Sequence, residues 1–300
     1  MTSIKLSTEV RPEELGVKIS LKDRIMLLGS CFADEMAGKM AEGGFDVCAN
    51  PFGTLYNPVS VRNAIRRLDT AAPYTEKDCV EMGAGSGRIC SFEHHTSFSA
   101  TDCGSFLKKA NDSLEKAVNF WKSCNKVIVT LGTAYVWEHK DFGIVSNCLK
   151  RNASEFTHRM PGVGQYAEIL ESIVSDHSDK EFIFTVSPIR HMSQDAHKNT
   201  LSKATLHLAL DEALSSIANK NAGIAGKGLN AVYFPAWEIL YDQLRDYRFY
   251  AEDMVHPSKT AIEIIWENFK ASAVPPEELR SIEMNAKAFR SRAHRNILGD

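Results

Sequence analysis

The sequence RIMLLGSCFA, at residues 24–33, runs from an apolar stretch into a turn built from small residues. An apolar run of this length with no alternating polar residues predicts a strand that is covered on both faces. The next residues, 34–42, place Met36, Ala37, Met40 and Ala41 at helical spacing. The stretch therefore predicts a buried strand, a tight turn and a helix, which is the beginning of a βαβ unit.

The same alternation continues along the chain. Further apolar runs predict buried strands at residues 126–131, 181–186 and 231–234, and helical patterns cover 105–123, 166–176, 198–220, 257–270 and 275–300. Strands that alternate with helices predict a three-layer α/β/α sandwich around a central parallel sheet. We expect one such domain over residues 1–272 and a helical extension over residues 273–300, and the glycine-rich residues 83–87 predict a loop or hairpin turn.

Composition excludes several classes of protein. The 300 residues are 44% hydrophobic with a net charge of −3, which excludes a disordered chain and argues against a nucleic-acid-binding surface over the whole molecule. Seven scattered cysteines without a CxxC pair favour free thiols over a disulfide framework or a four-cysteine zinc site. No apolar stretch is long enough to span a membrane or to form a signal peptide. We therefore expect a cytoplasmic protein without a membrane or nucleic-acid partner; the sequence does not indicate its oligomeric state.

Ser30 is the first candidate for chemistry. It follows the first predicted strand and precedes a helix, and open α/β sheets place their active sites at the carboxyl ends of strands. The N–H groups of that helix end could stabilise an oxyanion. The alternative is an ordinary helix-capping serine. A cysteine nucleophile at Cys31 is less favoured, because a residue one step along a tight turn points elsewhere.

Asp253 and His256 form the second candidate pair. A carboxylate three residues before a histidine can orient the ring within one turn and leave the other ring nitrogen free to act as a base. The alternative is a surface histidine beside a capping aspartate.

Several other polar residues could line a substrate site. In the turn at residues 50–54, Gly53 could supply an oxyanion donor, and Thr133 ends the second predicted strand. A structural turn is the alternative for both. His94 and His95 are expected to line a pocket or to be structural rather than to bind a metal. Arg190 could bind a carboxylate or phosphate, or could stiffen its loop through an ion pair.

Longer strings in the chain match a known family. They are LLGSCFA at 27–33, NPFGT at 50–54, LGTA at 131–134, VSPIRH at 186–191 and RDYRFYAEDMVHPS at 245–258. On these strings, residues from about 20 to 269 resemble the GSCFA family, which is similar to the SGNH (GDSL-like) hydrolases with their flavodoxin-like fold. The resemblance implies Ser30 as the nucleophile, His256 as the general base and Asp253 as its orienting carboxylate. It also implies an oxyanion hole made of the N–H groups of Ser30 and Gly53.

The chain departs from the SGNH pattern in one block. Those enzymes carry an asparagine that donates to the oxyanion, whereas residues 132–135 here are GTAY. Thr133, Asn147 and His191 are the candidates to replace it. The resemblance implies a serine esterase that removes a small acyl group from a small-molecule or glycan ester, with no cofactor or metal. The alternatives are an acyltransferase with the same triad and a ligand-binding module without activity.

Overall fold

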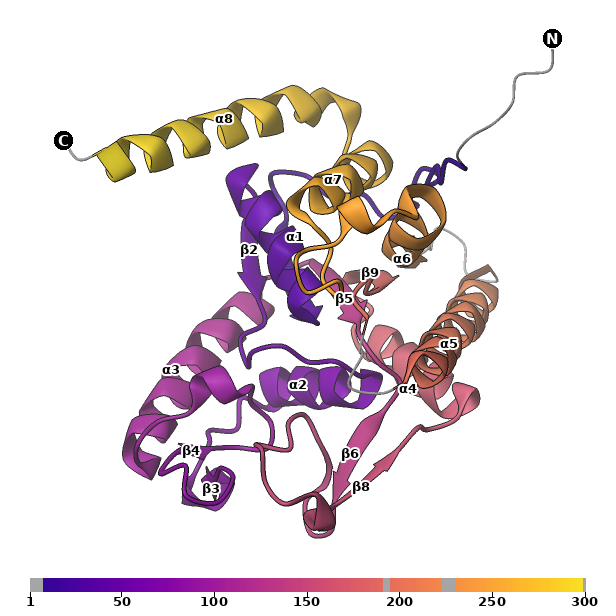
Figure 1. Ribbon diagram of the computed structural model, residues 1–300. Coiled ribbons are helices and arrows are strands. Elements are labelled where there is room, and N and C mark those ends of the chain that lie inside the picture. Colours follow the sequence, from indigo (N-terminus) through magenta and orange to yellow (C-terminus); the bar gives the residue numbers. More distant parts are fainter. Residues whose placement is uncertain (1–7, 191–194, 223–229, 299–300) are drawn as a thin grey trace.

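A five-stranded parallel sheet forms the centre of the computed structural model, which describes residues 8–190, 195–222 and 230–298 (Figure 1). Its strands are β1 (Arg24–Gly29), β2 (Asp46–Ala49), β5 (Lys126–Leu131), β9 (Glu181–Val186) and β10 (Ala231–Tyr233). They lie in the order β10-β9-β5-β1-β2, all parallel. This is the flavodoxin-like order. The chain adds β2 on one side of β1 and then adds β5, β9 and β10 on the other side, so the order of the connections reverses beside β1. The predicted fold class is confirmed.

Helices cover both faces of this sheet. One face carries α2 (Pro58–Thr70), α3 (Cys103–Trp121), α4 (Val163–Ser175) and α5 (Ala196–Ala222); the other carries α1 (Cys31–Glu42), α7 (Lys259–Ala273) and part of α8 (Pro276–Leu298). A separate hydrophobic core lies on each face: the first packs against α2 to α5 and the second against α1, α7 and α8. Because side chains alternate along a strand, Met26 and Leu28 of β1 enter the first core while Ile25 and Leu27 enter the second core. The alternation fixes the β1–α1 turn between the two layers.

Shorter strands and helices lie in the segments that connect the elements of these layers. β3 (Val80–Glu81) and β4 (Ile89–Cys90) form a small antiparallel pair around the glycine-rich turn, as predicted. β6 (Val136–His139), β7 (Gly143–Val145) and β8 (Phe156–Arg159) form an antiparallel sheet in the order β7-β6-β8. α6 (Ala236–Glu238) continues into a π-helical segment, Ile239–Leu244, and short 3-10 turns occupy Glu76–Asp78, Thr96–Phe98, Ala153–Glu155 and Tyr247–Phe249.

One cysteine pair contradicts the expectation of free thiols. A disulfide joins Cys79, just before β3, to Cys103, the first residue of α3. The other five cysteines, among them Cys31, are free. The pairing was not visible in the sequence because the two residues are 24 positions apart and only the fold brings them together. The inference of a cytoplasmic location therefore loses the support that it drew from free thiols.

The C-terminal helix is anchored to the α/β layers at its beginning. Ile282 of α8 is buried in the second core, and Asn285 Nδ2 donates to the carbonyl oxygen of Gly43 at 3.0 Å. Figure 1 shows the rest of α8 running past α1 as an extended rod. The division of the chain near residue 272 stays a prediction. Within the described residues, no helix is both long and apolar enough to cross a membrane.

Candidate active site

The turn between β1 and α1 is pressed against the neighbouring strand. Gly29 has a φ of +141°, and a Cβ atom there would lie 2.1 Å from the carbonyl oxygen of Thr130 in β5. Only glycine fits such a close backbone approach. The next N–H group, that of Ser30, donates to the same Thr130 oxygen at 3.1 Å. The turn is thus fixed at the carboxyl end of β1, where the reversal of strand order opens a crevice.

Ser30 points into the protein and not toward the predicted base. Its side chain is fully buried, and its hydroxyl donates to Ser187 Oγ, just past β9, at 3.0 Å. It occupies the N-cap position of α1 without a side-chain capping bond. No hydrogen bond within the described residues joins it to His256. The structure thus does not bring Ser30 and His256 together, because at this turn Ser30 continues the inward-facing side of the strand. The role of Ser30 as the nucleophile stays a prediction.

Cys31, the first residue of α1, takes the place that Ser30 was expected to fill. Its Sγ atom lies 3.5 Å from His256 Nε2, and the thiol is partly exposed. Burial, together with the nearby Asp34 and Glu35, raises its pKa, while the N–H groups of Cys31 and Phe32 act in the opposite direction. Burial prevails, so the resting group is a thiol that needs a base to become nucleophilic.

His256 is held by Asp253 in the manner expected from the sequence. Its Nδ1 atom lies 2.6 Å from Asp253 Oδ2, and Asp253 Oδ1 accepts from the N–H groups of Val255 and His256 at 2.9 Å each. These bonds, the two backbone ones first, lower the pKa of Asp253 to about 2. An ionised carboxylate fixes the proton on Nδ1 and leaves Nε2 free to accept the thiol proton. Met254, between them, has a left-handed φ of 59°, a strained conformation typical of functional turns.

Arg190 secures the loop that carries His256. Its backbone N–H donates to the carbonyl of Val255 at 3.5 Å, and its guanidinium donates to the Tyr241 hydroxyl. The guanidinium also lies 5.0 Å from the ring centroid of Tyr241 and 5.8 Å from that of Tyr250. These aromatic contacts stabilise the charge of the guanidinium. Within the described residues, no carboxylate pairs with it. His191, the next predicted site residue, lies outside the described residues.

The two predicted oxyanion donors are occupied. The N–H of Gly53 donates to the carbonyl of Asn50 at 2.7 Å, and that of Ser30 donates to the carbonyl of Thr130, so in this structure neither group is available to an oxyanion. The N–H groups of Cys31 and Phe32 begin a helix and therefore have no intrahelical acceptor. They point at Cys31 Sγ. The end of α1 thus offers two donors next to the sulfur, the place where an oxyanion would develop.

A cavity of about 530 Å³ is lined by Tyr56, whose phenol is close enough to Cys31 for the charges of the two groups to interact. Two predicted residues line it: Thr133, whose hydroxyl contacts Ser202 Oγ at 3.0 Å, and Asn147, whose Oδ1 accepts from the N–H of Leu149 at 2.8 Å. Tyr56 lines it too, and burial, followed by the charges of Cys31 and Asp34, raises the pKa of that phenol. Tyr56 therefore connects the nucleophile to the cavity, which has the size of a small-molecule site.

The wall of the cavity formed by the β7-β6-β8 sheet is aromatic. Tyr135 stacks on His158 with ring centroids 4.9 Å apart, and Trp137 stacks on the same ring at 4.2 Å. The two charged residues at its edge, Asp195 and Lys198, pair with each other at 3.4 Å. A cavity with stacked rings and balanced charge suits a neutral polar ligand with a ring. The sequence did not single out these aromatic residues, because only the register of β6 with β8 brings them together.

The remaining predicted histidines differ in position. His94 is fully buried among aromatic rings, and burial lowers its pKa to about 3, so it is a core residue. His95 packs against Gly53, where a Cβ atom would lie 2.3 Å from His95 Cβ, and its Nδ1 lies 3.0 Å from Ser97 Oγ. Its side chain is close enough to the carboxylate of Asp34 for the two charges to interact. His95 therefore lies on the Asp34 side of the nucleophile, and only His94 is excluded from substrate contact.

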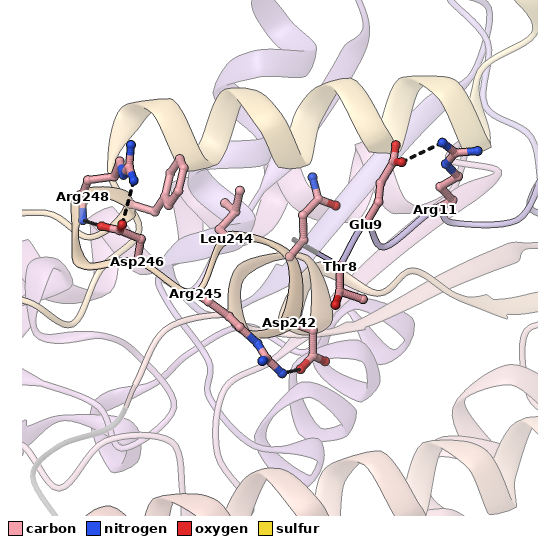
Figure 2. A pocket seen from close by; sticks show the side chains of 10 residues that line it. Thr8, Glu9, Arg11, Asp242, Leu244, Arg245, Asp246 and Arg248 are labelled. Carbon is pink, nitrogen blue, oxygen red and sulfur yellow. Dashed lines mark hydrogen bonds and ion pairs between the residues drawn. The ribbon is translucent and has the colours of Figure 1, made fainter. Parts of the chain in front are cut away.

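A second cavity, of about 1240 Å³, is lined by other residues (Figure 2). It is lined by the N-terminal segment and the chain around residues 242–249. Each arginine in it pairs with a nearby carboxylate: Arg11 with Glu9, Arg245 with Asp242 and Arg248 with Asp246. The charges of these three arginines are thus already matched. Neither cavity is lined by Cys31, His256 or Asp253, but the smaller one contains Tyr56, whose charge interacts with that of Cys31, and it is therefore the better candidate for a substrate site.

Comparison with known proteins agrees with the strings quoted from the sequence. The model of the GSCFA family matches residues 24–269, which include β1, the turn that carries Cys31 and the loop that carries His256. No curated protein sequence matches the chain.

Proposed function

The chain belongs to the GSCFA family, and from the geometry of its site we propose that it is an acyl-transferring ester hydrolase whose nucleophile is Cys31. One observation carries the proposal: Cys31 Sγ contacts His256 Nε2, and His256 Nδ1 contacts Asp253. Nucleophile, base and orienting carboxylate in this sequence of contacts constitute a catalytic triad. The proposal replaces Ser30, the nucleophile expected from the family resemblance, by Cys31. It keeps His256 as the base and Asp253 as the orienting carboxylate.

The first half of the reaction forms a thioester. His256 Nε2 takes the proton of Cys31 as Sγ attacks the ester carbonyl, and Asp253 stabilises the imidazolium. The carbonyl electron pair moves to oxygen, where the N–H groups of Cys31 and Phe32 can donate to it. The tetrahedral intermediate collapses, the carbon–oxygen ester bond breaks, and His256 gives its proton to the leaving alcohol.

The second half releases the acid. His256 Nε2 removes a proton from a water molecule, whose oxygen attacks the thioester carbonyl; the carbon–sulfur bond then breaks and the thiolate is reprotonated by His256. An alcohol in place of water would make the same site an acyltransferase. We propose that the alcohol portion lies in the cavity lined by Tyr56, Tyr135 and Trp137, whose stacked rings and balanced charge suit a sugar. The small acyl group and the carbohydrate remain inferences from the family resemblance.

Intact-mass spectrometry after incubation with an aryl acetate tests the nucleophile. Wild-type protein and Ser30→Ala should both gain one acetyl group, and Cys31→Ala should gain none. Neutral hydroxylamine should remove the adduct quickly, because it cleaves thioesters much faster than oxygen esters. Cys31→Ser is the matched variant that keeps the geometry and changes the attacking atom.

Two results would contradict the proposal. An acetyl group on Cys31→Ala that disappears in Ser30→Ala would return the nucleophile to Ser30. Absence of both an adduct and release of the alcohol on wild type, with a panel of acyl groups of increasing size, would favour a ligand-binding module on the same fold.

A further inference from the structure

Lys203, on the inner face of α5, is a buried cation at the same end of the sheet as Cys31. Only 2% of its surface is exposed, and its Nζ donates to the carbonyls of Gly132 and Ser187 at 2.7 Å each. Gly132 follows β5 and Ser187 follows β9, so one ammonium joins the carboxyl ends of two neighbouring strands. The ring of Trp237 lies 4.9 Å from Nζ.

Charge pairing distinguishes Lys203 from the other buried lysines. Lys126 pairs with Glu181, Lys180 with Asp179 and Lys270 with Glu267. Within the residues that the structure describes, no carboxylate lies within ion-pair distance of Lys203. A buried ammonium without a counter-charge is costly, so it either loses its proton or takes an anion as partner.

Cys31 is the group that can provide such an anion. Burial lowers the pKa of Lys203 to about 7, and the charge of Cys31 acts in the opposite direction. The two groups are also connected through the structure, because the hydroxyl of Ser30, the residue before Cys31, donates to Ser187, whose carbonyl accepts from Lys203. A lysine that can be protonated near neutral pH can therefore follow the ionisation of the sulfur.

We propose that Lys203 is a positioning residue that holds the strand ends beneath Cys31 and favours the thiolate by being protonated when the thiolate forms. The proposal rests on the proposed function only for the identity of the nucleophile. In the part of the chain that the structure describes, the other titratable groups that face the sulfur are His256 from its loop, Asp34 and Glu35 from α1, and Tyr56 from the segment before α2. On α5 itself His207 lies near Lys203, and Glu238 lies near His207.

The test measures the ionisation of Cys31 without any substrate. Iodoacetamide alkylates thiolates, so its rate at Cys31 as a function of pH, followed by mass spectrometry of the peptide that contains Cys31, gives the midpoint of ionisation. Lys203→Met should raise that midpoint by about one pH unit, which lowers the alkylation rate near neutral pH about tenfold. Lys203→Arg, which keeps a charge, should restore the rate in part.

The matched control is Lys180→Met. Lys180 Nζ also donates to two carbonyls, those of Trp121 and Cys124, and lies 4.8 Å from the Trp121 ring, but at the amino end of β9. Its loss should reduce stability and leave the Cys31 midpoint unchanged. A folded Lys203→Met protein with the wild-type midpoint would overturn the proposal and leave Lys203 a structural residue.

A second measurement covers the case in which Lys203→Met does not fold. In wild-type protein labelled with ¹³C at lysine Cε, one signal should titrate near neutral pH, and Cys31→Ala should move its midpoint down. Lysine signals that all titrate above pH 9, or a neutral-pH signal that Cys31→Ala leaves in place, would overturn the proposal. Neither experiment depends on turnover, so failure of the ester-hydrolase proposal can be told apart from failure of this one. In that case the ionisation midpoints of Cys31 and Lys203 would still depend on each other, but no acyl adduct would form.

Discussion

The two ends of the central sheet differ in whether their lysines are paired with carboxylates. At the amino end, Arg24 pairs with Asp46 and Lys126 with Glu181, and His177 Nε2 lies 3.1 Å from both carboxylate oxygens of Asp69 nearby. At the carboxyl end, Lys203 has no carboxylate partner within the described residues, and Cys31 is partly buried against His256. The fold thus pairs its lysines with carboxylates at the amino end, and leaves a buried ammonium without one at the edge where the strand order reverses, near the proposed nucleophile.

The strongest test of this difference replaces one histidine at each end. His256→Ala should lower turnover of an aryl ester by about 10³-fold, because within the described residues His256 is the base that contacts the thiol. His177→Ala should leave turnover within about twofold of wild type, although it also breaks a histidine–aspartate pair. Steady-state rates on one substrate measure both. Equal losses in the two variants would mean that the His256 effect is on folding, and circular dichroism would then show it.

Asp253→Asn tests the orienting carboxylate and should have a smaller effect. Loss of the orienting acid costs less than loss of the nucleophile or base in related triads, and we expect a fall of about 10²-fold. An asparagine can still accept the N–H groups of Val255 and His256 through its amide oxygen, so the loop should persist. Asp69→Asn is the control at the amino end. Unchanged turnover in Asp253→Asn would show that the tautomer of His256 is fixed by another group.

Most of the fold could be predicted from hydrophobic runs, and the parts that could not have a common cause. The three six-residue strands β1, β5 and β9 are apolar runs, and the helices predicted between them have apolar residues at helical spacing, so their sequences suffice. β2 is a four-residue strand with a polar first residue, and the β6 and β8 strands contain charged and histidine residues. Their structure depends on pairing partners, and so does the disulfide between Cys79 and Cys103. Partners distant in the chain leave no local pattern.

The site shows the same limit at the scale of one residue. Local spacing was enough to identify Asp253 and His256, because one turn of chain contains the whole interaction. The choice between Ser30 and Cys31 depended on which side chain faces His256, a residue more than 200 positions away. The premise that adjacent residues of a tight turn point in different directions was correct. In the structure Ser30 is the residue that turns toward Ser187, and Cys31 is the one that faces His256.

Gly29→Ala tests the close approach that places the turn. A Cβ atom at 2.1 Å from a backbone oxygen cannot be accommodated without moving β1 or β5, and the φ of +141° adds strain. We expect the free energy of unfolding to fall by about 3 kcal/mol or more, with loss of Cys31 reactivity in whatever protein remains folded. The matched control is Gly38→Ala inside α1, where a Cβ atom meets nothing within 4 Å. This variant should be more stable by about 0.5–1 kcal/mol. Urea denaturation of both proteins measures the difference, and similar losses would disprove the strain argument.

His94 provides the test with the smallest expected effect. It shows whether a buried titratable group without a counter-charge affects stability alone or also affects turnover. Like Lys203 it is buried with no carboxylate partner among the described residues, but it packs against Phe98 and Tyr74 and not against the proposed nucleophile. Burial lowers its pKa to about 3, below the ordinary value of 6.5. Between these two values the unfolded chain binds one more proton than the folded one, so His94 costs stability progressively as the pH falls through this window. In His94→Phe this loss should vanish, and the difference in unfolding free energy between wild type and variant should change by about 1.4 kcal/mol per pH unit from pH 6 down to pH 4. Turnover at pH 8 should stay near the wild-type value. A pH-independent difference would mean that His94 is protonated in the folded protein, and a large loss of turnover would make it part of the active site after all.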